Sequence, residues 1–110
     1  MSSTTGSQIV IVLTTLGADI DASAFAHTLI EERLAACVSA LPTMASVYRW
    51  KGSIEEAREQ LVVIKTTAAQ VDALQVRFRT LHPYEVPEFL IVWPDDASTL
   101  YGEWVRESVG

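Results

Sequence analysis

Short apolar runs rich in β-branched residues recur along the chain and predict strands. The runs at residues 9–13 and 89–93 are continuous, which is typical of strands that are covered on both faces. The segment at residues 44–50 contains Tyr48 and Trp50, and aromatic residues favour strands. Four strands are therefore expected, at residues 9–13, at 36–41 and resumed at 44–50 after an interruption at Pro42, at 54–67 and at 89–93.

Apolar residues at spacings of three and four predict helices between these strands. Val71, Leu74 and Phe78 follow this pattern and place one apolar stripe on the second helix. His82 precedes Pro83 and should end that helix, because a residue before proline avoids the helical region. Three helices are expected, from residue 22 to residues 34–36, at 67–81 and at 100–109.

The segment at residues 53–60 fits two structures. Ser53 and Glu56 match a capping box, and the charged residues between them favour a helix. However, the apolar run that follows at residues 61–65 is typical of a strand, and no turn signal separates the two segments. We interpret residues 54–67 as one long strand that forms a hairpin with residues 44–50.

The order strand, helix, strand, strand, helix, strand and final helix predicts an α+β fold. A repeated split β-α-β unit gives a ferredoxin-like βαββαβ sandwich, here with a long hairpin between the second and third strands and a C-terminal helix. We expect one domain at residues 8–110, preceded by a disordered tail at residues 1–7. A long exposed hairpin also favours pairing with another chain, and hence an oligomer.

Composition narrows the possible functions. The chain has 110 residues, of which 49% are hydrophobic, enough for one core. Its net charge of −6 argues against binding to nucleic acid or to an anionic membrane surface. One cysteine and two histidines exclude a disulfide framework and a closed structural zinc site within one chain.

The sequence also predicts a location. No apolar run approaches the length of about 20 residues that a membrane span needs. Residues 1–7 lack the basic residues that begin a secretory signal. Together with the single thiol of Cys37, these features favour the cytoplasm.

The segment at residues 82–88 is the most concentrated set of polar and rigid residues. It presents His82, Glu85 and Glu88 from a proline-stiffened loop, a combination that suits a divalent metal ion or a proton-transfer pair. The alternative is structural, with the prolines directing the chain and the carboxylates in solvent. Cys37 is either a small buried apolar residue or a soft metal ligand.

Other residues suggest a cleft or a subunit contact. Tyr48, Trp50 and Trp104 are aromatic residues of the kind that bury area at such surfaces. Lys65 ends an apolar strand, where it is solvated or pairs with a carboxylate such as Glu59 or Glu85. No phosphate-binding glycine loop or nucleophile elbow is present in the sequence, so we expect no enzymatic activity.

Several separate motifs, in matching order and spacing, resemble the CutA divalent-cation tolerance family. They are residues 32–38, 48–52, 64–66 and 82–88, with Tyr101 and Trp104 near the end of the chain. The resemblance implies a ferredoxin-like fold assembled as a homotrimer, similar to the PII signal proteins, with residues 54–60 in the long hairpin. It also implies divalent-metal binding, with copper(II) as one ion and His82 at the position of a proposed ligand.

The sequence departs from this family pattern at two positions. Thr14 stands where some bacterial members have cysteine, and Leu81 stands where some have the first of two histidines. The implied metal set is therefore His82 with Glu85 or Glu88, together with Cys37. The alternative function is a PII-like module that holds a small molecule or a partner in clefts between subunits, lined by Tyr48, Trp50, Glu59, Lys65, Tyr84 and Trp104.

Overall fold

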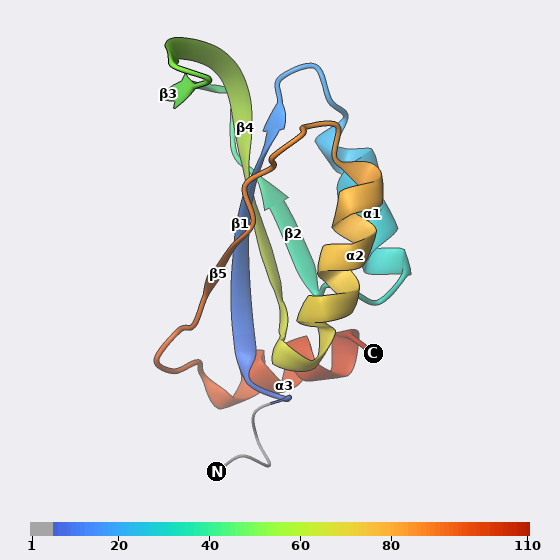
Figure 1. The fold of residues 1–110 in the computed structure, drawn as a ribbon. Helices are drawn as coiled ribbons and strands as arrows, with labels where there is room; N and C mark the ends of the chain where they lie inside the picture. The colour runs from blue at the N-terminus through green and yellow to red at the C-terminus, as the bar shows by residue number, and fades with distance from the viewer. Residues whose placement is uncertain (1–5) are drawn as a thin grey trace.

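The computed structural model describes residues 6–110, which form one antiparallel sheet with three α-helices (Figure 1). The predicted order of strands and helices is confirmed, except that the predicted strand interrupted at Pro42 is two separate strands in the structure, with residues 41–43 between them. Of the predicted tail, residues 1–5 lie outside the described residues, whereas the carbonyl groups of Gly6 and Ser7 accept hydrogen bonds from Ala69 N and Arg106 Nε. The elements are β1 (Ile9–Gly17), α1 (Ala22–Glu31), β2 (Cys37–Ala40), β3 (Met44–Trp50), β4 (Ser53–Thr67), the 3-10 turn η2 (Ala68–Gln70), α2 (Val71–Leu81), β5 (Leu90–Val92) and α3 (Thr99–Ser108).

Strand β4 organises the sheet. The strand order is β2-β4-β1-β5, and β3 pairs with the outer part of β4. β1 pairs with β4 from Ile9 opposite Thr67 to Gly17 opposite Glu59. Both β2 and β3 therefore lie on the same edge of β4, and β3 carries the hairpin beyond the rest of the sheet. The predicted long strand is confirmed, and the helical alternative for residues 53–60 is wrong.

The two faces of the sheet differ in what covers them. Helices α1 and α2 lie on one face (Figure 1), where alternate residues of β1 and β4 such as Val12 and Ile64 are fully buried. On the opposite face, Val105 of α3 packs against Ile9 and Ala36 at one end only. No helix within residues 6–110 has the length and apolar character that crossing a bilayer requires.

A row of apolar residues lies on the face without α1 and α2. Leu13, Val63 and Leu90 are partners across β1, β4 and β5, and therefore point to the same side of the sheet. Leu13 and Val63 are half-buried, and Leu90 is 55% exposed. We call the surface formed by these three residues the open sheet face.

Helix α1 ends earlier than predicted, because Arg33 takes a backbone conformation that glycine usually provides. Arg33 has φ 59°, and Leu34 N and Arg33 N donate to the carbonyls of Leu29 and Ile30, which is the bonding pattern of a Schellman motif. A non-glycine residue in this conformation costs roughly 1–2 kcal/mol. The Arg33 guanidinium offsets this cost by donating to the carbonyls of Glu107 and Gly110 at 2.8 Å.

Strand β1 is longer than predicted and runs to Gly17 rather than ending at residue 13. Its extension contains Thr14 and Thr15, which are both buried because β4 pairs with them and the fold covers them. Thr14 is on the side of Val12 and Leu16, toward the core beneath the helices, whereas Thr15 is on the opposite side. This extension brings Thr15 to the site described next.

Candidate functional site

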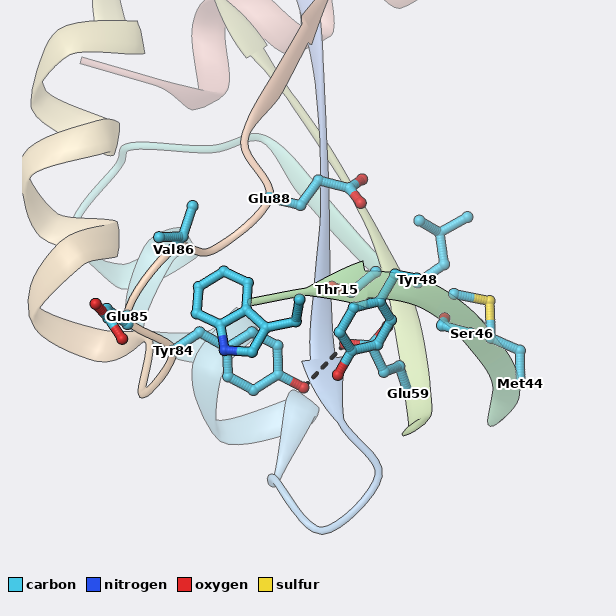
Figure 2. Close-up of a pocket in the computed structure, with 11 residues that line it drawn as sticks. Thr15, Met44, Ser46, Tyr48, Glu59, Tyr84, Glu85, Val86 and Glu88 are labelled. Atoms are coloured by element: carbon cyan, nitrogen blue, oxygen red, sulfur yellow. Dashed lines mark hydrogen bonds between the residues drawn. The ribbon is translucent and has the colours of Figure 1, made fainter. Parts of the chain in front are cut away.

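A pocket of about 590 Å³ lies where the β3–β4 hairpin meets the loop at residues 82–88 (Figure 2). It combines three aromatic side chains with three carboxylates. Of the residues predicted to line a cleft, Tyr48, Trp50, Glu59 and Tyr84 are present, and the predicted metal-binding residues Glu85 and Glu88 are there too. The remaining lining residues are Thr15, Met44, Ser46, Leu61 and Val86.

Strand alternation explains one wall of this pocket. Met44, Ser46, Tyr48 and Trp50 occupy every second position of β3, so their side chains share a face. The hairpin reverses at Lys51 and Gly52, which both have positive φ, as a type I′ turn requires. This turn fixes the register in which Met44 is opposite Glu59 and Trp50 is opposite Ser53.

Glu59 and Tyr84 meet at the base of the pocket. The Tyr84 hydroxyl donates a 2.9 Å hydrogen bond to Glu59 Oε2 (Figure 2). Glu59 is only 7% exposed, and no ion pair within residues 6–110 includes its carboxylate. Desolvation, together with the Glu59 hydrogen bond and charge, raises the pKa of Tyr84 to about 12. Tyr84 therefore stays neutral at physiological pH, and its hydroxyl stays a donor.

His82 supports the pocket from behind. Its Nδ1 accepts a hydrogen bond from the Tyr84 backbone N–H at 3.2 Å, so the proton is on Nε2, which donates to the Thr15 carbonyl at 2.6 Å. The imidazole is 7% exposed and packs edge-on against the Tyr84 ring, with 4.7 Å between centroids. Both ring nitrogens are thus engaged within the chain. In this arrangement His82 orients Tyr84 and has no free lone pair for a metal ion.

The predicted metal-binding residues do not converge within one chain. Glu85 and Glu88 line the pocket, but Glu85 also lies 3.9 Å from Lys51 Nζ. Among the described residues, no group of three or more His, Cys, Asp and Glu side chains is placed to hold a metal ion. These residues therefore do not fit a closed metal site in the single chain.

Three predicted site residues lie away from the pocket. Cys37 is opposite Lys65 in the sheet, four residues along β4 from Leu61, or roughly 13 Å at about 3.3 Å per residue. Lys65 Nζ lies 5.7 Å from the centroid of the Tyr101 ring, and no ion pair with Glu59 or Glu85 is formed among residues 6–110. Trp104 packs against the same Tyr101 ring, so these residues form a separate cluster beside α3.

Sequence reasoning missed several residues of the pocket. The alternation of β3 was a usable signal for Met44 and Ser46, because Tyr48 and Trp50 are on the same phase of that strand. Thr15 was missed because the apolar run ends at residue 13 and gives no sign that the strand continues. Leu61 and Val86 have no distinguishing chemistry in the sequence.

Replacing Glu59 by glutamine is expected to lower the pKa of Tyr84 from about 12 toward its ordinary value of 10. The variant removes the negative charge, while desolvation continues to raise the pKa in part. Because the raised pKa favours the neutral phenol in the folded state, the stabilisation by Tyr84 is present below pH 10. It is lost as the pH rises from about 10 to about 12.

The titration is followed by NMR of the tyrosine ring carbons, with Tyr84→Phe used to assign the signal. Glu56→Gln is the matched control, because Glu56 is on the opposite side of the same strand, across from Val47. An unchanged Tyr84 pKa in Glu59→Gln would show that the Glu59 charge does not act on this phenol.

Comparisons with a family model and with individual known proteins point to the same family. Residues 10–108 match the family model described as CutA1 divalent ion tolerance protein. The chain is 40% identical over 100 residues to the divalent-cation tolerance protein CutA of Thermus thermophilus, covering 91% of this chain and 97% of that protein. It is 43% identical over 86 residues to the human protein CutA, covering 78% of this chain and 48% of the human protein, so the chain spans about half the length of that relative.

Solved structures agree with these sequence relationships. The divalent cation tolerance protein of Thermus thermophilus superposes with a TM-score of 0.89 at 39% identity, covering 94% of this chain and 100% of that one. CutA1 from Oryza sativa superposes with a TM-score of 0.88 at 32% identity, covering 93% and 94% of the two chains.

Proposed function

The chain belongs to the CutA1 divalent ion tolerance family, and from this premise we propose that it acts in divalent-cation tolerance by binding cations in its acidic pocket. The observation that carries the proposal is that Glu59, Glu85 and Glu88 line one pocket of a chain whose net charge is −6. Negative charge concentrated in a cleft raises the local concentration of cations. The role requires binding and no catalysis.

Divalent metal would bind at the accessible carboxylates. Glu85 is exposed and Glu88 is half-buried, so both can exchange water for an ion. His82 would first have to give up a hydrogen bond to Thr15 or Tyr84, and Cys37 is too far along the sheet. With few converging donors, we expect weak binding of copper(II) and other divalent ions rather than a tight copper site.

We also propose that the protein is a homotrimer with a ferredoxin-like, PII-like arrangement. The strand order β2-β4-β1-β5 and the placement of α1 and α2 on one face support the ferredoxin-like assignment (Figure 1). The open sheet face supports self-association, because a contiguous apolar surface of this kind favours contact with another chain. The unpaired thiol of Cys37 is in keeping with a cytoplasmic location.

A second candidate function is small-molecule binding in the same pocket. Its volume of about 590 Å³ is within the range of about 300–1,000 Å³ that is typical of ligand sites. Its aromatic walls favour an organic ligand, since a bare metal ion gains little from contact with Tyr48 and Trp50. This is the PII-like alternative, with the pocket as the ligand site.

Calorimetric titration with copper(II) tests the metal proposal. We expect no tight stoichiometric binding at micromolar metal, and saturable binding at higher concentration. Glu85→Gln and Glu88→Gln should each weaken it by about two- to fivefold, the usual range for an exposed charge. His82→Gln serves as the contrasting variant. Tight binding that is lost in His82→Gln, or weak binding unaffected by either glutamate, would contradict the carboxylate assignment.

A further inference from the structure

The pocket has the chemistry of a site for an organic cation. A tight metal site needs several oxygen, nitrogen or sulfur donors that converge on one point, and no group of three or more His, Cys, Asp and Glu side chains does so among residues 6–110. An alkylammonium ion has diffuse charge and needs instead ring faces and nearby negative charge. Tyr48, Trp50 and Tyr84 supply the rings, and Glu59 at the base supplies the charge. We propose that this pocket binds an organic ammonium cation.

The base of the pocket is built before any ligand arrives. Tyr84 is held by its hydroxyl on Glu59, and its backbone N–H and ring are held by His82. Glu59 is nearly buried and has no cationic partner among the described residues. A carboxylate that faces a pocket, where water is partly excluded, gains more from a cation than a fully solvated carboxylate does. A ligand that brings a positive charge therefore finds a carboxylate that no cationic side chain of the described residues already pairs with.

At the rim of the pocket, an ammonium group of the chain itself already lies near an aromatic ring and a carboxylate. Lys51 Nζ lies 5.5 Å from the centroid of the Trp50 ring and 3.9 Å from Glu85 Oε1. Trp50 and Glu85 thus receive a cation within the chain, by a ring face and a carboxylate together. Lys51 is attached at the turn and is largely exposed, so it occupies the rim and leaves the base near Glu59 to a ligand.

The proposal rests on the second candidate function, in which the pocket is a ligand site. Choline is the probe, and 3,3-dimethylbutan-1-ol, which has the same shape without the charge, is the matched uncharged probe. Calorimetry or ligand-observed NMR on the protein of residues 1–110 measures the binding of both probes. We expect choline to bind at least about tenfold more tightly than the alcohol.

Two pairs of variants assign the binding to the pocket. Tyr48→Leu should weaken choline binding severalfold, whereas Tyr48→Phe keeps the ring and should retain it. Glu59→Gln should weaken it, whereas Glu56→Gln removes the same charge from the opposite side of β4 and should not. Tyr48 is 44% exposed, so its variants test the site even if the buried Glu59 variant folds poorly.

Lys51→Asn tests the competing ammonium at the rim. Asparagine tolerates the positive φ of this turn position, so the hairpin is retained. We expect choline to bind more tightly, because the internal cation that competes for Trp50 and Glu85 is gone. Unchanged affinity for choline in this variant would contradict the claim that Lys51 competes with the ligand for Trp50 and Glu85.

The outcomes separate the proposals. Equal binding of choline and the uncharged alcohol would overturn the preference for a cation and leave the pocket as a ligand site. Absence of binding by both probes would overturn the organic-cation proposal alone, because it leaves organic ligands of other shapes untested. The copper(II) titration is a separate experiment, and its result does not depend on whether choline binds. Divalent-cation binding is therefore tested independently of the organic-cation proposal.

Discussion

Replacing Phe78 by alanine is expected to lower the free energy of unfolding by about 3–5 kcal/mol. Phe78 is 1% exposed and is in the centre of the core between the sheet and the helices. Its ring centroid is 6.3 Å from that of Phe25 and 5.0 Å from those of Phe89 and His82. The truncation removes apolar burial and leaves a cavity that these rings cannot close without moving.

Phe78→Ala should also alter the structure of the pocket. His82 packs on Phe78 and orients Tyr84, so a cavity at Phe78 is expected to loosen Tyr84 and weaken choline binding as well. Denaturant unfolding at one fixed protein concentration measures the stability. Val76→Ala is the control, because Val76 is on the same helix but 68% exposed, and it should change stability by no more than about 0.5 kcal/mol. A loss below about 1.5 kcal/mol for Phe78→Ala would show that the core closes around the deletion.

Introducing a charge into the open sheet face is expected to separate the subunits of the proposed trimer. Val63→Glu places a carboxylate next to Leu13 in the row that these two residues form with Leu90. Burying that charge between chains without a partner is costly. The mass by light scattering should fall from three times 12.1 kDa to 12.1 kDa.

Leu90→Glu supplies an independent test, since Leu90 is 55% exposed in the single chain and its substitution leaves the monomer core intact. Val76→Glu is the matched control on the outer surface of α2 and should remain trimeric. The melting temperature of the unsubstituted protein should rise with protein concentration, because dissociation accompanies unfolding. A mass of 12.1 kDa for the unsubstituted protein would disprove the trimer, and an unchanged mass in both open-face variants would place the interface elsewhere.

Much of the fold was predictable because residues that are close in the sequence determine where strands and helices form. Alternation and helical spacing identified the strands and helices in the right order, since each pattern follows from which face of an element is buried. The start of α1 also has a local cause, because the side chain of Asp21 accepts a hydrogen bond from Ala24 N. The predicted hairpin between residues 44–50 and 54–67 is present, and its turn at Lys51 and Gly52 sets the register.

The boundaries were less predictable because distant contacts set them. Helix α1 ends at Glu31 because Arg33 bonds to carbonyls at the C-terminus, a contact across more than 70 residues that no local pattern contains. Residues 53–60 have good helix propensity in isolation. They are extended because β3 supplies a partner for each of residues 53–59, and β1 pairs with Gln60.

For the candidate site, the sequence by itself determined the chemical groups, and the tertiary structure decided which of them act together. The loop at residues 82–88 and the aromatic residues of β3 were recognisable from the sequence alone. Only the fold showed that Glu59 meets Tyr84, 25 positions away, and that His82 uses both nitrogens internally. Only the fold separated Cys37 and Lys65 from the pocket. The physical reason is that periodicity records which side of an element is buried, whereas a site depends on the register between strands and on hydrogen bonds between distant segments.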